Sequence, residues 1–78
     1  MNFVNISLYN NKINWEGIDA IMHALKNIYS LREIAIDVSC NPLGNNGFVL
    51  ISKALSGMRK INKLWLSVYD IGINDDSF

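Results

Sequence analysis

The chain has 78 residues, of which half are apolar, and seven basic side chains balance seven acidic ones. This length allows one domain or part of one, and the apolar content favours a packed core over disorder. The zero net charge without charge runs argues against nucleic acid or anionic membranes as partners, and the short apolar runs exclude membrane insertion.

The first predicted element is a strand at residues 4–8, because Val4, Ile6 and Leu8 alternate with polar residues. A turn follows, after which apolar residues recur every three or four positions, as on one face of a helix. Asn14 is the predicted N-cap of this helix, since its side-chain oxygen can accept from amides of the first turn. The apolar stripe, which follows Gly17, comprises Ile18, Ile21, Ala24, Leu25 and Ile28.

The same order of elements returns 30 residues later. A strand is predicted at residues 34–38, and a helix follows Gly47, with Asn45 or Asn46 as its N-cap. A second shift of 30 residues predicts a third strand at residues 64–68. The sequence therefore divides into units at about 4–33, 34–63 and an incomplete 64–78, and strand-helix-strand units of this kind imply parallel strands. The second apolar stripe comprises Phe48, Ile51, Ala54, Leu55 and Met58.

Asparagine and glycine recur where each strand turns toward its helix. Asn11 and Asn41 each offer two donors and one acceptor in a short side chain, so a ladder of buried amides can satisfy the backbone groups of the turn. Gly44, or Asn14 in the first unit, suits a left-handed turn, and Pro42 is a local stiffener without a counterpart in Lys12. The glycine before each stripe allows a close approach to the neighbouring turn. The predicted structural corner is thus Asn11, Asn41, Gly17, Gly44 and Gly47.

The pattern Leu31-x-x-Ile34-x-Ile36-x-Val38-x-x-Asn41-x-Leu43-Gly44-x-x-Gly47, followed by Ile51-x-x-Ala54-Leu55, resembles the leucine-rich repeat family. The resemblance is to the ribonuclease-inhibitor-like class and covers essentially the whole chain. It implies an α/β solenoid with parallel strands on a concave face and helices on a convex face. The chain departs from the family pattern by two extra residues between Leu31 and Asn41, and by Ile and Val in place of most leucines.

The third unit allows two alignments. Strict 30-residue spacing places Ile71 at the Asn position. A shorter spacing places Tyr69 there and makes Ile71 and Gly72 equivalent to Leu43 and Gly44.

Other interpretations of Gly44-x-x-Gly47 fit less well. A dinucleotide-binding loop needs a further glycine and an acidic ribose partner, and a KH-type nucleotide clamp needs basic surroundings. A hairpin at Asn46-Gly47 needs a strand directly after it, whereas residues 48–58 have helical spacing.

No catalytic or metal site is expected. Cys40 and His23 are the single members of their types, but the pattern places His23 on the outer face of a helix and Cys40 at a strand end. Asp75 and Asp76 lack further ligands at suitable spacing and are expected to be solvated. We therefore predict no enzyme activity, cofactor or small-molecule substrate, and an unpaired cysteine without a signal-peptide pattern predicts an intracellular, cytoplasmic location.

The strand residues that alternate with the core align in three rows, which are Asn5-Ala35-Trp65, Ser7-Asp37-Ser67 and Tyr9-Ser39-Tyr69. Large aromatic side chains among small polar ones are typical of protein-binding surfaces. Trp65 is the leading contact, whereas Trp15 starts a helix and is expected to pack. The predicted protein-binding residues are Trp65, Tyr69, Asp37, Tyr9, Ser7, Ser67 and Asn5.

Two functional hypotheses follow. In the first, the chain is a non-catalytic interaction module that binds a protein through its concave face. In the second, it is a structural subunit or fragment buried in a larger assembly, without a dedicated ligand. A solenoid of this length leaves both ends of its core uncovered, so the 78 residues are expected to belong to a longer solenoid or a larger assembly.

Overall fold

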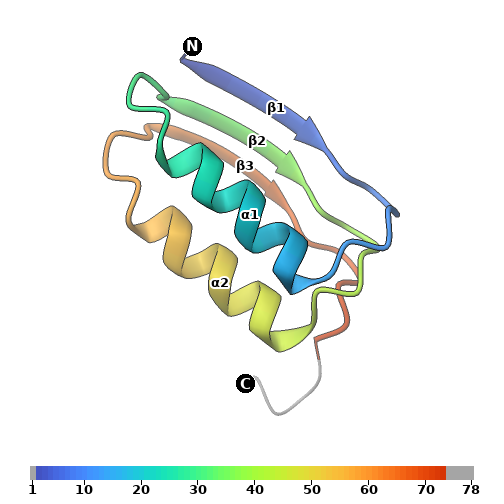
Figure 1. Ribbon diagram of the computed structural model, residues 1–78. Helices are drawn as coiled ribbons and strands as arrows, with labels where there is room; N and C mark the ends of the chain where they lie inside the picture. Colours follow the sequence, from blue (N-terminus) through green and yellow to red (C-terminus); the bar gives the residue numbers. More distant parts are fainter. Residues whose placement is uncertain (1, 74–78) are drawn as a thin grey trace.

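The computed structural model describes residues 2–73, in which three parallel strands alternate with two helices. The helices lie side by side on one face of the sheet, whose strand order follows the chain (Figure 1). Among these residues, no helix has the length and apolarity needed to cross a membrane. The prediction of an α/β arrangement is confirmed. The elements are β1 (Phe3–Ser7), α1 (Trp15–Lys26), β2 (Glu33–Asp37), α2 (Gly44–Ser56) and β3 (Lys63–Ser67).

The strands pair with the offset that the sequence shift predicts. Val4 lies opposite Ile34, and Ile34 lies opposite Leu64, so that neighbouring positions differ by 30 residues along both pairs of strands. Because side chains alternate along a strand, this register places the apolar positions of all three strands on the same face. The 30-residue spacing is thus built into the sheet.

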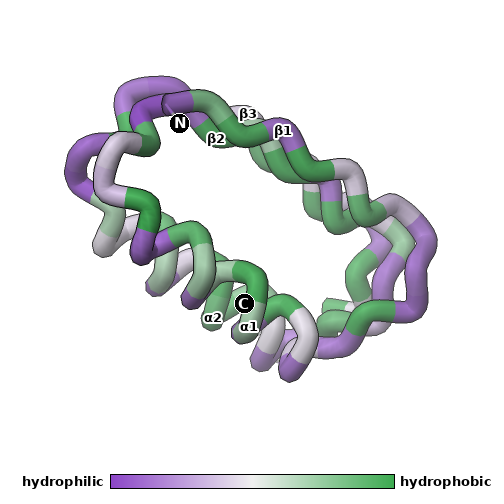
Figure 2. The backbone as a smooth tube through the Cα atoms, turned by 45° about the horizontal axis from the view of Figure 1, so that its top comes forward, coloured by the Kyte–Doolittle hydropathy of each residue, from purple (hydrophilic) through white to green (hydrophobic). Residues whose placement is uncertain are grey.

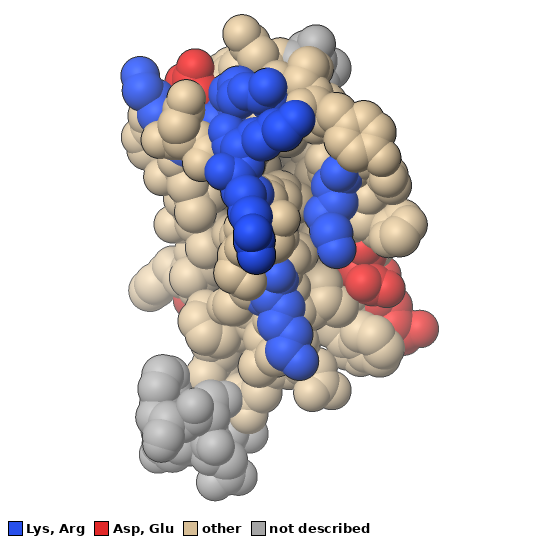
Figure 3. Space-filling model, turned by 90° about the vertical axis from the view of Figure 1, so that its left-hand side faces the viewer, with Lys and Arg blue, Asp and Glu red and all other residues tan. Residues whose placement is uncertain are grey.

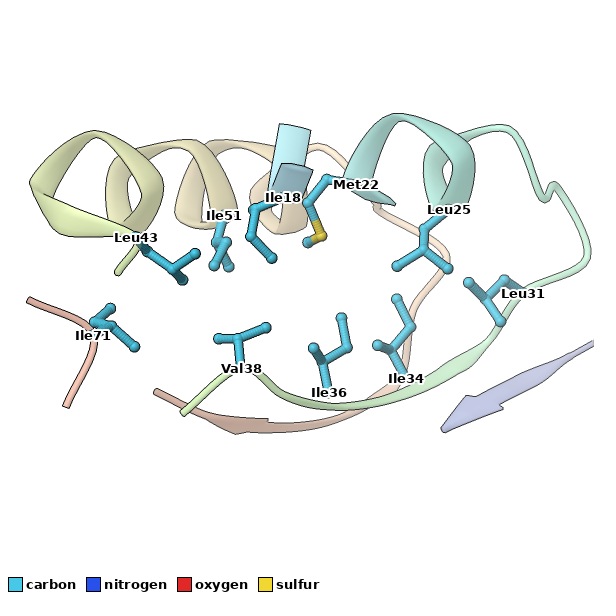
Figure 4. Close-up of a cluster of buried hydrophobic side chains, with 10 residues drawn as sticks. All are labelled: Ile18, Met22, Leu25, Leu31, Ile34, Ile36, Val38, Leu43, Ile51 and Ile71. Atoms are coloured by element: carbon cyan, nitrogen blue, oxygen red, sulfur yellow. The ribbon is translucent and has the colours of Figure 1, made fainter. Parts of the chain in front are cut away.

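The core fills the space between the strand layer and the helix layer, which Figure 2 shows joined by loops at both ends. Ile34, Ile36 and Val38 point from the second strand toward the helices (Figure 4). Burial of such side chains contributes roughly 1.5–3 kcal/mol each. The ten buried apolar residues are Ile18, Met22, Leu25, Leu31, Ile34, Ile36, Val38, Leu43, Ile51 and Ile71.

The first helix begins where predicted, and the second begins earlier. α1 starts at Trp15, directly after its predicted N-cap Asn14, whereas α2 starts at Gly44, before the predicted caps Asn45 and Asn46. Ile28 and Met58, which were assigned to the helical stripes, lie beyond the helix ends. In α1 the buried side chains are Ile18, Met22 and Leu25, whereas Ala24, which was assigned to the stripe, is exposed. These three residues are four and three positions apart, which places them on one face of the helix. Ala24 lies outside that face.

The predicted N-caps are half correct. The Asn14 side-chain oxygen accepts a hydrogen bond from the Gly17 amide at 3.1 Å, as expected for an N-cap. The prediction of Asn45 or Asn46 as the second cap was wrong, because α2 already begins at Gly44 and its N-cap position has no capping side chain.

Pro42 explains why the second corner differs from the others. At the equivalent positions Lys12 and Gly72 have φ of 57° and 81°, a conformation that the proline ring forbids. The second corner instead places its left-handed residue at Gly44, with φ of 69°. The left-handed turn predicted for Gly44 is therefore confirmed, whereas Asn14, with φ of −96°, does not adopt it.

The third unit follows the strict 30-residue spacing. Asp70 has φ of 54°, matching 57° at Asn10 and 60° at Cys40, so the chain turns at the same position in every unit. Ile71 is 2% exposed and its carbonyl accepts from the Gly44 amide at 2.8 Å, whereas Tyr69 is 75% exposed. The alternative alignment was wrong in placing Tyr69 at the buried Asn position. Its pairing of Ile71 and Gly72 with Leu43 and Gly44 agrees with equal burial of Ile71 and Leu43 and with positive φ at both glycines.

The third strand is less covered than the second. Leu64 aligns with the buried Ile34 but is 47% exposed, and Leu66 and Val68 are half-buried. Within residues 2–73 no helix follows β3 to lie over them. Core-type side chains are consequently accessible at this edge of the sheet.

Candidate functional site: the open face of the sheet and its corners

The face of the sheet turned away from the helices carries an open hollow. Strand pairing aligns Asn5, Ala35 and Trp65 across it, and Asp37 and Ser67 lie one row further along. Trp65 is 54% exposed beside the small Ala35, so one face of the indole is available for contact. The hollow, called the open-face hollow below, has a volume of about 510 Å³ and is lined by Asn5, Ala35, Ile36, Asp37, Leu64, Trp65, Leu66 and Ser67.

Asp37 is held in place at the centre of this face. The Ser39 amide donates to its Oδ1 at 3.0 Å. This backbone hydrogen bond, followed by the side chains of Ser39 and Ser67, lowers the pKa of the Asp37 carboxyl. Ser7 and Ser67 lie opposite it on the two neighbouring strands. The row therefore presents a fixed anionic acceptor between hydroxyl groups.

The stabilising effect of Asp37 should depend on pH. Because its folded-state pKa lies below the usual 3.8, the carboxylate stabilises the fold above that pH and loses this effect as pH falls through the lower folded-state pKa. We expect Asp37→Asn to be less stable than the wild type near neutrality and to approach it in acid. Urea denaturation between about pH 6 and about pH 2 measures the difference. Asp19→Asn, an exposed change on α1, serves as control, and a pH-independent difference at Asp37 would contradict the assignment.

The third predicted row is not a continuous exposed row. Ser39 is buried, and hydrogen bonds satisfy its hydroxyl, which lies 3.0 Å from that of Ser67 and accepts from the Tyr69 amide at 2.9 Å. Both tyrosines are exposed beyond the strand ends. A hydrogen bond with the Cys40 side chain raises the pKa of the Tyr9 hydroxyl. Tyr9 thus belongs with the corner rather than with the open-face hollow.

Asn41 satisfies the backbone of two successive corners. It is 2% exposed, and its Oδ1 accepts from the amides of Asn11 and Ile13 at 2.8 and 3.0 Å. Its Nδ2 donates to the carbonyls of Leu8, Val38 and Ser39 at 2.7, 2.9 and 3.2 Å. The predicted structural role of Asn41 is confirmed, with every lone pair and proton directed at a backbone partner.

Asn11 does not repeat this role in the first unit. Its side chain is exposed, and the hydrogen bond that its Nδ2 donates goes to the Tyr9 carbonyl two residues away, at 3.2 Å. The predicted ladder therefore has one formed rung. The physical reason is directional: Asn41 reaches the corner of the unit before it, and within the described residues no unit lies before β1.

The two helix glycines permit close contacts. A Cβ at Gly47 would lie 2.6 Å from Cβ of Leu43 and 3.4 Å from Cβ of Trp15, and one at Gly17 would lie 3.0 Å from Cγ2 of Ile13. The tightest contact at each glycine is with the corner of its own unit and not, as predicted, with the neighbouring one; the neighbouring unit comes near only at Trp15. Both glycines also lie inside the first helical turn rather than before it. Trp15 packs its base against α2 while its ring remains partly exposed.

The structure separates the single cysteine from the single histidine. His23 is exposed in the last turn of α1, whereas Cys40 lies half-buried in the turn that follows β2, at the opposite end of the units. Within residues 2–73, no three acidic, histidine or cysteine side chains are grouped as metal ligands would be. Asp75 and Asp76 lie outside the described residues.

Sequence reasoning missed a second hollow, which we call the basic hollow. It has a volume of about 280 Å³ and lies where both helices end. The neutral composition concealed it, because cations separated in the sequence meet at this end of the molecule (Figure 3). The 30-residue shift pairs Ile28 with Met58 and Leu31 with Ile61, and the step that was missed is that Lys26, Arg59 and Lys60 fall beside these pairs. Its lining is Leu25, Lys26, Ile28, Tyr29, Leu31, Gly57, Met58, Arg59, Lys60 and Ile61.

No family model matches the chain, and comparisons with curated proteins and with solved structures likewise give no match.

Proposed function

We propose that the chain is a non-catalytic protein-interaction module of the leucine-rich-repeat type, which binds a protein partner through the open, concave face of its sheet. The repeating strand-turn-helix order, the 30-residue strand offset and the buried Asn41 support the family assignment. Exposed aromatic and polar residues on the free face support the binding role.

The exposed indole of Trp65 carries this proposal. An indole that lies against small neighbours can bury a large area with little loss of side-chain entropy. The ionised Asp37 beside it provides a directional acceptor for a cationic or hydrogen-bonding group of the partner. Interface hot spots are enriched in tryptophan, and Trp65 lies among the residues of the open-face hollow where a partner would seat.

Replacing Trp65 with alanine is expected to weaken partner binding by about 2 kcal/mol, or about 30-fold in Kd. The partner would be isolated by co-purification with the full chain from its native source, and the Kd measured by calorimetry with wild type and variant. Since the chain has two tryptophans, the variant Trp15→Phe leaves Trp65 as the single tryptophan, which is excited selectively over the tyrosines at the long-wavelength edge of the absorption band. Binding over Trp65 should then shift its emission to the blue.

Val49→Ala is the control, because Val49 is an apolar side chain, 48% exposed, on α2 and away from the open face and the basic hollow. It should leave this affinity unchanged. Wild-type affinity in Trp65→Ala, together with unchanged emission on binding, would refute the placement of the site.

The second candidate function is that of a structural subunit within a longer solenoid or a larger assembly. Accessible core-type residues at the sheet edge, such as Leu64, and the outward-facing amide of Asn11 favour it. Asn11 in such an assembly would serve the corner of a unit stacked on β1, as Asn41 serves the first corner. Hydrogen exchange in the native complex separates the two functions: protection of Trp65 and Asp37 supports the first, and protection of β1, β3 or the helices supports the second.

A further inference from the structure

The basic hollow is framed by two loops of the same shape. Ile28 donates to the Leu25 carbonyl at 3.1 Å, and its counterpart Met58 donates to the Leu55 carbonyl at 3.1 Å. Three residues further, Leu31 and Ile61 repeat the same turn, with hydrogen bonds of 3.2 Å in both loops. The two loops therefore hold the hollow open with ordered backbone on both sides, which reduces the entropy lost when a ligand binds.

Positive charge gathers at this end of the molecule. In parallel units, the helix ends and strand starts share one edge, and six of the seven lysines and arginines lie there, with Lys12 at the opposite edge. Figure 3 shows these cations clustered on one face. Glu33 is the one acidic residue among those described at this end. The six cations are Lys26, Arg32, Lys53, Arg59, Lys60 and Lys63.

Helix stabilisation accounts for only part of this cluster. Lys26 and Lys53 lie in the last turns of α1 and α2, where a cation offsets the partial negative charge of the helix end. Arg59 and Lys60 lie beyond the end of α2 and also line the hollow. That dipole effect falls off within the last turn, so it does not explain these two residues.

The floor of the hollow is aliphatic and recessed. Leu25 and Leu31 are buried, and Ile28, Met58 and Ile61 are half-buried around them. A volume of about 280 Å³ is at the small end of ligand pockets and suits one or two large side chains. Nucleobases would leave polar edges unpaired on such a floor, and membrane attachment needs protruding rather than recessed apolar groups.

We propose that the basic hollow binds an acidic peptide segment of a protein partner, with one leucine- or phenylalanine-sized side chain on the aliphatic floor and flanking carboxylates against Lys26, Arg59 and Lys60. The cations around the hollow favour an acidic ligand by charge complementarity, and the aliphatic floor favours a ligand that also carries an apolar side chain. The site lies on a different surface from the open-face hollow, so this inference is independent of the function proposed above.

Fluorescence anisotropy with a labelled eight-residue peptide tests the proposal. The peptide consists of Asp and Glu with one central Phe, and a matched peptide carries Ser in place of the Phe. The full chain should bind the first peptide, more weakly as salt rises, and should bind the second much less. Reversing one cation, as in Lys26→Glu, should weaken binding by at least about tenfold, as expected for a charge beside carboxylates. Lys60→Glu, which lies outside the helices, tests the same point without changing a helix end.

Lys12→Glu is the control of equal net charge at the opposite edge and should retain the peptide affinity. An equal loss in Lys12→Glu, or equal binding of the Phe and Ser peptides, would overturn the proposal, because either result indicates nonspecific attraction. Tighter binding to phosphatidylserine vesicles or to single-stranded DNA would overturn it in favour of those ligands. Trp65→Ala should leave peptide binding intact, and its loss in that variant would move the peptide to the open face.

Discussion

Replacing Asn41 with alanine is expected to lower the free energy of unfolding by about 3 kcal/mol, because buried backbone groups that lose a partner each cost about 1–3 kcal/mol. Two of the partners, the carbonyls of residues 38 and 39, are in buried hydrogen bonds. The amides of residues 11 and 13 and the carbonyl of residue 8 are in part-buried ones, where water can replace much of the lost partner. A domain of this size has about 4–12 kcal/mol in total. Urea denaturation followed by circular dichroism measures the loss.

Asn11→Ala is the matched control, since it removes the same side chain from the equivalent position of the first unit. There the amide is exposed and its Nδ2 donates to the Tyr9 carbonyl. We expect a change within about 0.5 kcal/mol, as for ordinary surface positions. Equal losses in the two variants would mean that burial of Asn41 is not the source of its stabilising effect.

Gly47→Ala is expected to destabilise the protein by about 1–3 kcal/mol through overpacking. The added methyl group would lie 2.6 Å from Cβ of Leu43, a buried position in the chain's own corner, and 3.4 Å from Cβ of Trp15 on α1. The contact with Leu43 is the severe one, and its Cβ is not the flexible end of a side chain, so relief requires the backbone at the start of α2 to shift relative to Leu43. Thermal and urea denaturation of the variant measure the effect.

Gly57→Ala provides the opposite case in the same segment. Gly57 follows α2 with φ of −84°, and the nearest atom to an added Cβ is the Ala54 carbonyl oxygen at 3.6 Å. The alanine should be neutral or stabilise by about 0.4–1 kcal/mol, because it restricts the unfolded chain without strain. If both alanines destabilise alike, the close contact at Gly47 is not the cause.

The strand register followed from the sequence, whereas the helix core did so only in part, since the buried Met22 was not in the predicted stripe and the predicted Ala24 is exposed. A gap-free shift of 30 residues places like residues at like positions, and parallel pairing then gives Val4 opposite Ile34 and Ile34 opposite Leu64. Asn41 was predictable for a related reason, since a buried corner requires a short side chain with both donors and an acceptor. Four of the predicted contact residues line the open-face hollow, namely Asn5, Asp37, Trp65 and Ser67.

The predictions that failed have three separate physical causes. Pro42 excludes the left-handed conformation of Lys12, so the second corner turns at Gly44 and α2 starts there, which removes Asn45 and Asn46 as caps. Ser39 lies past the strand end, where the simple alternation of exposed and buried residues stops. The basic hollow was not predicted, because net charge and charge runs are properties of the linear sequence. They do not show that the loops of parallel units lie at one edge and bring their cations together there.

The hydrogen bonds of Asn41 also determine when the first corner can be completed as the chain is synthesised. The amide that completes the first corner comes from the second unit, so the first corner stays open during synthesis until residue 41 has left the ribosome. Loss of the second unit would leave the turn at residues 8–13 without its side-chain partner. The first corner is thus completed by the unit that follows it in the chain.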